Sequence, residues 1–455
     1  MKTDLESLNS AFATHRDRYI AEWSEFLRFP SISAEPAHAD DCRRCSDWLT
    51  QHLAGLGFRA ERLDTPGRPA VFAVRDGQTG RPVVLFYGHY DVQPVDPLAD
   101  WTTPPFEPAL RDGRLYARGA QDNKGQVFYA VKALEHLIRS DWAGATVKVL
   151  IEGEEENGSG GLGAMIPLWK ERLKADILMV CDTGAVDSGA PTITMGLRGI
   201  VFVDFVLDGP DHDLHSGTHG GAAPNPAMGM AHLLAGLHRA DGSIAVEGFY
   251  DGVQPPSDRE RALSNRAPID VAAYRRDTGV DPVSGEPAFT PRERIGFRPT
   301  LEVNGLHSGY GGPGTKTIIP AMAEAKLSAR LVPGQDPRRT LDAILRHLEG
   351  HVPRGLRLRI RETQIAGPGF RLDAESPLVA KADAVLRRVA GRDTAFLWEG
   401  ASVPIVSALA AASGAEPLLV GFGQESDRIH APNESFSIEQ FRKGFLYVSA
   451  FLADL

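Results

Sequence analysis

Four short apolar segments of this 455-residue chain each lead into a turn that carries acidic or imidazole side chains. Their length and β-branched content are typical of strands buried on both faces of a parallel sheet. Ligands bind outside the carboxyl ends of such strands, so residues far apart in sequence can converge there. The pattern suggests a two-metal hydrolase. The segments are 82–87, before His89 and Asp91; 146–151, before Glu155 and Glu156; 177–181, before Asp182; and 417–421, before the loop with His430.

The composition of the chain excludes several classes of protein. The chain is 42% hydrophobic and 24% charged, which suits two or three domains with real cores. Its net charge of -10, without any basic run, argues against a nucleic-acid partner. Residues 1–29 have no signal-peptide core, and no apolar stretch reaches transmembrane length, so we expect no membrane association. Three cysteines make no disulfide framework, which favours a cytoplasmic location.

The order of predicted elements changes near residue 195. Before it, strand and helix patterns alternate. Between about 197 and 365 the patterns read β-α-β-β-α-β, the ferredoxin-like order. The last part must return to the first domain, because it supplies His430. We therefore predict an α/β catalytic domain with a mixed, largely parallel sheet from 1–195 and 367–455. A ferredoxin-like lid and dimerisation domain is inserted at 196–366, with 248–297 as a long irregular excursion.

A pair of divalent ions needs a carboxylate that can face both of them, further carboxylates, and neutral imidazoles. Asp122 lies in a turn before a predicted helix and could face both ions, although alone it would read as a helix N-cap. His89 alone would read as a hydrogen-bonded histidine at a strand end. With Asp91 two residues on, the pair is typical of a metal ligand oriented by a carboxylate. The acidic run 154–156 would read as a solvated loop, but it follows a buried strand and precedes a Gly-rich turn.

Two further motifs give little support for a functional site. Cys42 and Cys45 form a C-x-x-C inside a helix-like stretch without a second pair, which favours two helical cysteines over a redox or zinc site. The Gly-rich segment 309–317 lacks the phosphate-loop spacing and precedes a strand-like segment, so we predict no nucleotide site there.

Three motifs together carry a family resemblance that spans almost the whole chain. They are GHYDVQP at 88–94, ARGAQDNKG at 117–125 and EGEEENGS at 152–159. They resemble the co-catalytic metallopeptidase family of carnosinase-type dipeptidases, aminoacylases, glutamate carboxypeptidases and succinyl-diaminopimelate desuccinylases. The resemblance implies His89 and Asp182 on one ion, Glu156 and His430 on the other, and Asp122 bridging both. It also implies that Asp91 orients His89, that Glu155 is the general base, and that the peptide after Asp122 is cis.

The lid motifs look most like those of the nonspecific dipeptidase and carnosinase branch. They are DLHSG at 213–217, KTIIP at 316–320 and LSARLVP at 327–333, and outside the lid EGASVP at 399–404 resembles the branch's substrate-contacting loop. The resemblance implies that His215 reaches the neighbouring subunit's site to stabilise the oxyanion, and that Arg330 binds the substrate carboxylate through its planar fork. Thr317 and Ser402 would assist. Arg330 alone would read as a solvated strand residue, and Ala401 departs from the branch, which often has a second glycine there.

We therefore expect a homodimeric metallodipeptidase that hydrolyses dipeptides or short peptides with a free C-terminal carboxylate. Two divalent ions per subunit are implied, with zinc expected and manganese or cobalt as alternatives. An N-acyl-amino-acid amidohydrolase or a desuccinylase would use the same metal centre. A protein that only binds metal or peptide is the alternative of another class, and it would have no need of Glu155.

Overall fold

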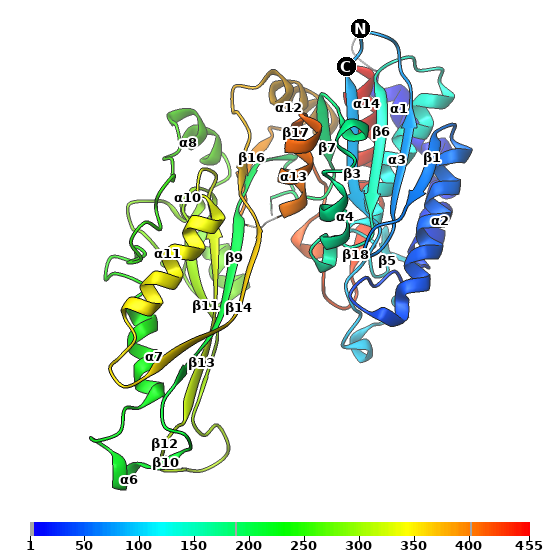
Figure 1. Ribbon diagram of the computed structural model, residues 1–455. Coiled ribbons are helices and arrows are strands. Elements are labelled where there is room, and N and C mark those ends of the chain that lie inside the picture. Colours follow the sequence, from blue (N-terminus) through cyan, green and yellow to red (C-terminus); the bar gives the residue numbers. More distant parts are fainter. Residues whose placement is uncertain (1–3, 187–188, 401–402) are drawn as a thin grey trace. The chain divides into compact units, whose positions relative to one another are not determined.

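The computed structural model describes residues 4–186, 189–400 and 403–455. The chain forms two compact units, which the chain path connects more than once (Figure 1). Unit 1 comprises Met1–Met195, Leu372–Leu397 and Ile405–Leu455, and unit 2 comprises Gly196–Arg371 and Trp398–Pro404. No helix among the described residues is long and apolar enough to cross a membrane.

Unit 1 is built around a mixed sheet with the strand order β1-β2-β6-β3-β7-β17-β8-β15, in which β16 also pairs with β8; the last strand, β15, belongs to unit 2 and pairs with the end of β8. The four central strands β6, β3, β7 and β17 run parallel to one another, and β1, β2 and β8 join the sheet antiparallel. A small sheet, β18-β5-β4, is separate. The strands are β1 (Arg59–Leu63), β2 (Ala70–Arg75), β3 (Val83–His89), β4 (Ala109–Arg111), β5 (Arg114–Tyr116), β6 (Thr146–Glu152), β7 (Ile177–Val180), β8 (Thr192–Leu197), β15 (Phe370–Arg371), β16 (Ala395–Trp398), β17 (Glu416–Leu419) and β18 (Ser435–Ser437).

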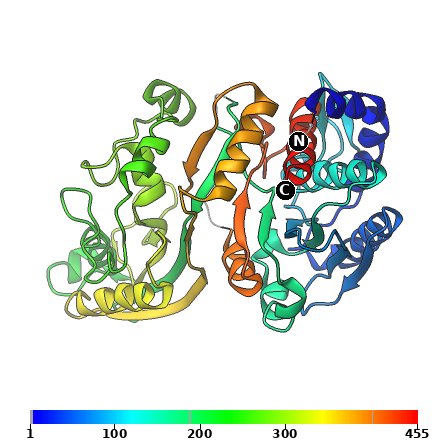
Figure 2. The ribbon, with the colours of Figure 1, turned by 90° about the horizontal axis from the view of Figure 1, so that it is seen from above.

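Helices from both ends of the chain pack together in unit 1. The first and last helices, α1 and α14, lie side by side and both contact α3 (Figure 2). Helix α3 is buried along nearly its whole length, and it begins directly after the loop that carries Asp122. The helices of unit 1 are α1 (Leu5–Leu27), α2 (Ala39–Gly55), α3 (Lys124–Arg139), α4 (Gly160–Met165), α5 (Lys170–Leu173), α12 (Pro377–Ala390), α13 (Pro404–Ser413) and α14 (Ile438–Ala453), with 3-10 turns η1 (Pro36–His38), η2 (Leu98–Asp100), η3 (Glu155–Asn157) and η4 (Glu425–Asp427).

Unit 2 has a four-stranded antiparallel sheet with the order β11-β13-β9-β14. Along the chain its strands and two main helices follow the order β9-α7-β11-β13-α11-β14, which is the βαββαβ order expected for residues 196–366. One face of the sheet packs against α7 and α11 over a core that includes Val203, Phe205, Met230 and Ile344. The elements are β9 (Gly199–Asp208), β10 (Leu214–His215), α6 (Ser216–His219), α7 (Pro226–Ala235), α8 (Asp258–Ser264), α9 (Val271–Thr278), α10 (Pro291–Phe297), β11 (Thr300–Ser308), β12 (Ile318–Ile319), β13 (Met322–Leu331), α11 (Pro337–Gly350) and β14 (Arg357–Gly367).

The excursion at 248–297 is more regular than its composition predicted. It contains α8, α9 and α10, so the expectation of an irregular segment was wrong. Two capping boxes explain the difference, because Ser257 with Glu260 starts α8 and Thr290 with Glu293 starts α10. In each box the hydroxyl accepts from the N3 backbone and the carboxylate accepts from the cap backbone, which satisfies donors at the helix start.

The predicted boundary also needs a correction at one short segment. Residues 398–404 were assigned to the catalytic domain, whereas Trp398–Pro404 groups with unit 2. The Trp398 ring packs against Phe297 at a centroid distance of 4.8 Å. The carbonyl of Gly400 accepts a hydrogen bond from Arg198 Nε at 3.0 Å. These contacts therefore group the segment with unit 2, although the residues on both sides of it in sequence belong to unit 1.

Candidate metal centre

The carboxyl ends of the four central parallel strands meet at one edge of the unit 1 sheet. His89 is the last residue of β3, where it pairs in register with Glu152 at the end of β6. Glu155 and Glu156 follow in η3, and Asp182 comes shortly after β7. His430 lies in the loop after β17 and η4, with its backbone at a φ of 58°. Strand register therefore brings the predicted ligands to one place.

Asp122 lies between two groups of candidate ligands. Its Oδ1 is 3.2 Å from His89 Nε2, and its Oδ2 is 2.9 Å from His430 Nε2. On the first side, Asp182 Oδ2 is 3.7 Å from His89 Nε2. On the second, Glu156 Oε2 is 3.3 Å from His430 Nε2. In each group the ligand atoms lie within 4.8 Å of one another. The Asp122 carboxylate is a member of both groups.

Asp122 is not the N-cap of α3. That position belongs to Asn123, which makes no side-chain cap hydrogen bond. The peptide between the two residues is cis, as the family resemblance implied. The Asp122 carboxylate faces the two imidazoles instead of the helix start.

The hydrogen bonds of His89 fit a metal ligand. Its Nδ1 lies 3.0 Å from the carbonyl oxygen of Asp91, and a carbonyl can only accept, so Nδ1 carries the proton. In the neutral ring Nε2 then presents a lone pair. This buried Nε2 has no hydrogen-bond partner among the described residues, although carboxylate oxygens of Asp122 and Asp182 face it. A lone pair that faces two carboxylates is stabilised by a cation between them, so the residues present fit a bound metal ion.

The charges of the site also fit cations. Burial raises the pKa of Glu156 to about 7, and the charge of Asp122 adds to the rise, while His430 opposes it. Burial raises the pKa of Glu155 well above its ordinary value, with Asp182 and Glu156 contributing and His89 opposing. Hydrogen bonds with Asp122 and Glu156 raise the pKa of His430 to about 10. The crowded carboxylates thus favour added positive charge, which metal ions would supply.

Asp91 connects the first imidazole to the acidic turn. Its Oδ1 lies 3.3 Å from His89 Nδ1, and its two oxygens accept the backbone N–H groups of Glu155 and Glu156 at 3.2 and 3.1 Å. The side chain is fully buried. Asp91 therefore fixes both the ring and the turn that carries the two glutamates, and only the first of these two effects was expected.

Glu155 lies beside the ligand groups and belongs to neither of them. Its Oε2 is 3.9 Å from His89 Nε2, and its side chain is 18% exposed. Glu156, in contrast, faces His430 and also accepts from Gln93 Nε2 at 2.7 Å. The two neighbouring glutamates therefore point to different tasks.

Two residues of the centre were missed by the sequence analysis. Glu434 accepts the backbone N–H groups of Gly119, Gln121 and Asp122 at 2.9–3.0 Å and pairs with Arg118 at 2.9 Å, so it holds the loop that presents Asp122. Asn123 Nδ2 donates to Asp182 Oδ1 at 2.8 Å. Both lie within four residues of predicted ligands, yet no spacing rule marks a residue that only holds a loop or a ligand in place.

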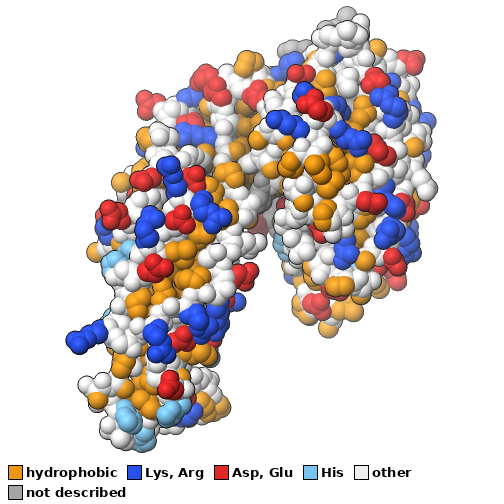
Figure 3. All heavy atoms as spheres, viewed as in Figure 1, with side chains coloured by type: hydrophobic (Ala, Val, Ile, Leu, Met, Phe, Trp, Pro, Cys, Tyr) orange, Lys and Arg blue, Asp and Glu red, His pale blue; other side chains and the backbone are white. Residues whose placement is uncertain are grey.

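The residues expected to contact substrate from the lid lie in unit 2. His215 ends β10 and Thr317 precedes β12, both exposed at one end of the unit where histidine side chains gather (Figures 1 and 3). The backbone N–H of Ser216 donates to the Thr317 carbonyl at 3.0 Å, so these two loops are adjacent. Arg330 lies in β13 and lines a different part of the unit, and Ser402 lies outside the described residues.

Comparisons with known proteins decide the family. Residues 85–454 match the peptidase family M20/M25/M40. The chain belongs to this family. It is 30% identical to a cysteinylglycine-S-conjugate dipeptidase of Corynebacterium striatum, over 94% of this chain and 93% of that protein. It is 26% identical to the Cys-Gly metallodipeptidase dug1 of Schizosaccharomyces pombe, over 100% and 99% of the two chains.

A solved structure agrees with this assignment. The M20 family metallo-carboxypeptidase Sso-CP2 from Sulfolobus solfataricus matches with a TM-score of 0.83 and 31% identity, over 96% of this chain and 98% of that one. The present chain, called the M20 peptidase below, is therefore a metallopeptidase, a hydrolase of peptide bonds. The alternative of a protein that only binds metal or peptide is not supported.

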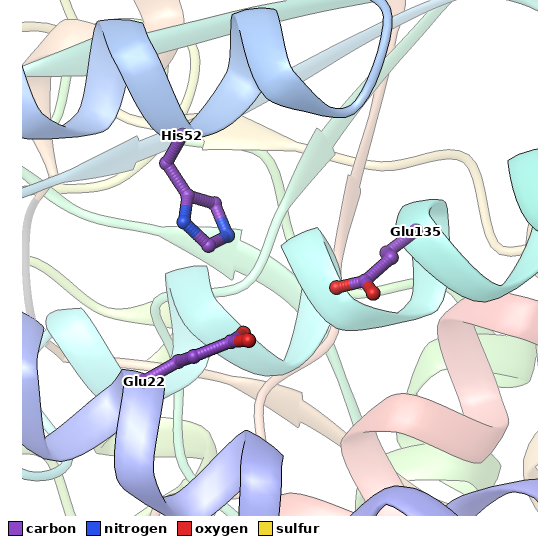
Figure 4. A group of neighbouring side chains, drawn as sticks. All are labelled: Glu22, His52 and Glu135. Carbon is purple, nitrogen blue, oxygen red and sulfur yellow. The ribbon is translucent and has the colours of Figure 1, made fainter.

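A third group of carboxylates and imidazole in the M20 peptidase was not expected from the sequence. Glu22, His52 and Glu135 come from three helices and point toward one another (Figure 4). The fully buried Lys132 ammonium lies among them, 2.9 Å from His52 Nε2 and 2.9 Å from Glu135 Oε2, and it also bonds Glu22. A lysine cation thus already occupies the centre of this group, which makes it a structural ion network.

The C-x-x-C pair of the M20 peptidase is buried in α2. Cys42 and Cys45 are both fully buried and free. Burial raises the pKa of the Cys42 thiol to about 12 and that of Cys45 to about 11. Thiols held in the protonated form are poor nucleophiles and poor metal ligands, which fits the expectation of two helical cysteines.

Proposed function

We propose that this M20 peptidase is a two-metal dipeptidase that hydrolyses dipeptides or short peptides with a free C-terminal carboxylate. The observation that carries the proposal is one carboxylate, Asp122, shared by two imidazole and carboxylate groups, with Glu155 beside them. The dipeptidase names of relatives that span nearly the whole chain support the substrate class.

His89 and Asp182 would hold one ion, Glu156 and His430 the other, and Asp122 both. Zinc fits the mixture of imidazole and carboxylate ligands, and manganese or cobalt would also be accepted. When bound, such a pair of ions lowers the pKa of water and polarises the substrate carbonyl.

The chain's own groups would supply the remaining chemistry. Glu155 accepts a proton from the attacking water and passes it to the leaving amine. Asp91 keeps the His89 ring and the turn of Glu155 in place through the hydrogen bonds described above. Arg330 binds the substrate carboxylate through its planar fork. Thr317 and Ser402 assist in substrate binding.

His215 would donate a hydrogen bond to the oxyanion of the neighbouring subunit's site, which makes the enzyme a homodimer through unit 2. Its Nδ1 accepts the backbone N–H of Gly217 at 3.1 Å. The proton of the neutral ring is therefore on the exposed Nε2, where it can be donated. Three buried free cysteines agree with a reducing, cytoplasmic location.

The test is to remove metal with a chelator, restore zinc, manganese or cobalt separately, and assay dipeptides, tripeptides and N-acyl amino acids. We expect metal-dependent hydrolysis of dipeptides, with much lower rates on N-acyl amino acids. Preferential hydrolysis of N-acyl amino acids would favour the amidohydrolase or desuccinylase alternative. Hydrolysis that survives complete metal removal would refute the two-metal proposal.

A further inference from the structure

Unit 2 contains a cavity of about 760 Å³ that is rich in arginine. This volume lies within the range of small-molecule sites, roughly 300–1,000 Å³. Residues of β11, β13 and the 248–297 excursion form its wall. Its charged lining consists of Arg198, Arg294, Arg298, Arg330, Glu286 and Glu302. Arginine outnumbers glutamate here, in a chain whose net charge is -10.

The arginines of the cavity differ in how their charge is balanced. Arg298 forms a two-point ion pair with Glu286 at 2.6 and 2.8 Å. Arg198 donates only to backbone carbonyls, from Nε to Gly400 at 3.0 Å and from Nη1 to Arg298 at 3.3 Å. Within the described part of the chain, no carboxylate lies within ion-pair distance of Arg198. A partly buried guanidinium of this kind retains the capacity to bind an anion.

Arg198 and Arg330 both line this cavity and are close enough for their charges to interact. Arg330 is opposite Ile200 in the pairing of β13 with β9, and Arg198 comes two residues before Ile200. Arg198 itself stands between β8 and β9, directly before the first paired residue, Gly199. Burial and the positive charge of Arg330 together lower the pKa of Arg198 to about 10, against the opposing effect of Glu302. Both guanidinium groups stay charged at neutral pH and repel each other.

A bound anion would relieve this repulsion, and Arg198 and Arg330 can each bind a carboxylate through a planar fork. We propose that Arg198 and Arg330 form a two-arginine site for substrates with a second carboxylate, namely dipeptides whose C-terminal residue is acidic. Arg330 takes the α-carboxylate and Arg198 the side-chain carboxylate. This inference rests on the proposed function, in which Arg330 contacts the substrate.

The experiment compares an acidic substrate with its neutral isostere. The metal-reconstituted enzyme is assayed for kcat/KM on Ala-Glu and Ala-Gln at low salt. We expect a preference of roughly 10- to 100-fold for Ala-Glu, the worth of one charge-assisted hydrogen bond. R198Q should abolish this preference while Ala-Gln turnover changes only a few-fold. R198K keeps the charge but loses the fork, so it should retain part of the preference.

R294Q is the matched control, because Arg294 lines the same cavity and, like Arg198, donates to backbone carbonyls, here those of Pro282 and Ser284. It should keep the preference. Loss of the preference in R294Q to the same extent as in R198Q would show a diffuse field in place of a site. An equal fall of kcat/KM on both substrates in R198Q would show that Arg198 acts only through its hydrogen bond to Gly400. Either result overturns the inference.

A binding measurement separates this inference from the proposed function. Metal-loaded E155Q protein is titrated with glutamate and glutamine, with and without R198Q. Tighter binding of glutamate that depends on Arg198 is expected. Turnover of Ala-Gln without any preference for glutamate would refute the two-arginine site and leave the dipeptidase intact. Absence of turnover on every dipeptide would refute the proposed function.

Discussion

Two histidines, one in each unit, show opposite hydrogen bonding at the same ring atom. His89 in unit 1 is buried, and its Nδ1 donates to a carbonyl, so its Nε2 presents a lone pair. His215 in unit 2 is exposed, and its Nδ1 accepts a backbone N–H, so its Nε2 carries the proton. One ring is prepared to bind a metal ion and the other to donate to an anion. The local backbone, and not the residue type, sets the chemistry.

The surroundings of the two histidines differ as well. The centre in unit 1 is complete in itself, because every proposed metal ligand comes from that unit and is held by buried partners such as Asp91 and Glu434. His215 and Thr317 are exposed, at the end of β10 and directly before β12. Unit 1 should therefore bind metal by itself, whereas the residues of unit 2 contribute only when another surface meets them.

The largest expected effect comes from the two neighbouring glutamates. E155Q should keep both ions and lower kcat by about 10²–10⁴-fold, because it removes a proton acceptor without removing a ligand. E156Q is the matched variant and should lose metal. Metal content and kcat are measured together for both proteins. Near-normal turnover in E155Q, or full metal content in E156Q, would show that the two roles are assigned wrongly.

The next effect tests whether unit 2 completes a neighbouring site. H215A should lower kcat by about 10²–10³-fold, the usual cost of losing an oxyanion donor, with metal content unchanged. H219A serves as the control, because His219 is an exposed histidine in α6, the short helix that His215 caps. It should keep nearly full activity.

Complementation sharpens the test of His215. Mixing H215A with E155Q subunits under exchange conditions should regain activity, since each heterodimer has one site with both groups intact. Verified heterodimers that stay as inactive as both parents would contradict a role across the dimer. His215 would then be a polar loop residue.

A smaller effect should follow from loosening the loop of Asp122. E434Q removes the charge that faces Arg118 and weakens the hydrogen bonds to the loop, so metal affinity should fall by roughly 10–100-fold. A control is E439Q, since Glu439 is exposed and pairs only at the surface with Arg442 and Lys443. Metal titration of both variants measures the difference. Equal metal affinity in E434Q and wild type would refute the positioning role.

The smallest effect concerns pH and the Lys132 network. Burial lowers the pKa of His52 to about 4, and the charge of Lys132 contributes. The unfolded chain, with an ordinary histidine pKa near 6.5, takes up the proton first as pH falls. The free energy of unfolding should therefore decline between pH 6.5 and 4, by at most about 1.4 kcal/mol per pH unit. H52Q should decline less when denaturant unfolding is compared between pH 6.5 and 5. Parallel curves would show that His52 is not held neutral.

The sequence predicted the fold well where a pattern has a period or a repeated chemistry. Buried strands that end in acidic or imidazole residues indicated the parallel centre of the sheet, and the helix predicted after Asp122 forms at Lys124–Arg139. The helices of 248–297 were missed because their short length hides periodicity, although the S-x-x-E and T-x-x-E capping boxes were present.

The candidate site was predictable only as far as the ligands themselves. Residues that act through backbone groups, such as Glu434, carry no spacing signal, since their partners can be any residue type. Arg198 was also missed, because its proximity to Arg330 arises from the pairing of β9 with β13. Long-range register decides such neighbours, and a single sequence does not reveal it.

The hydrogen bonds between Glu434 and the Asp122 loop have a consequence for biosynthesis. A ribosome makes the loop more than three hundred residues before it makes the carboxylate that holds the loop. His430 also emerges in this late segment. A nascent chain thus has strands and ligands but lacks the piece that closes the centre. Hydrolytic activity should therefore arise only after residues 430–434 have been made, so that a shorter nascent fragment is inactive.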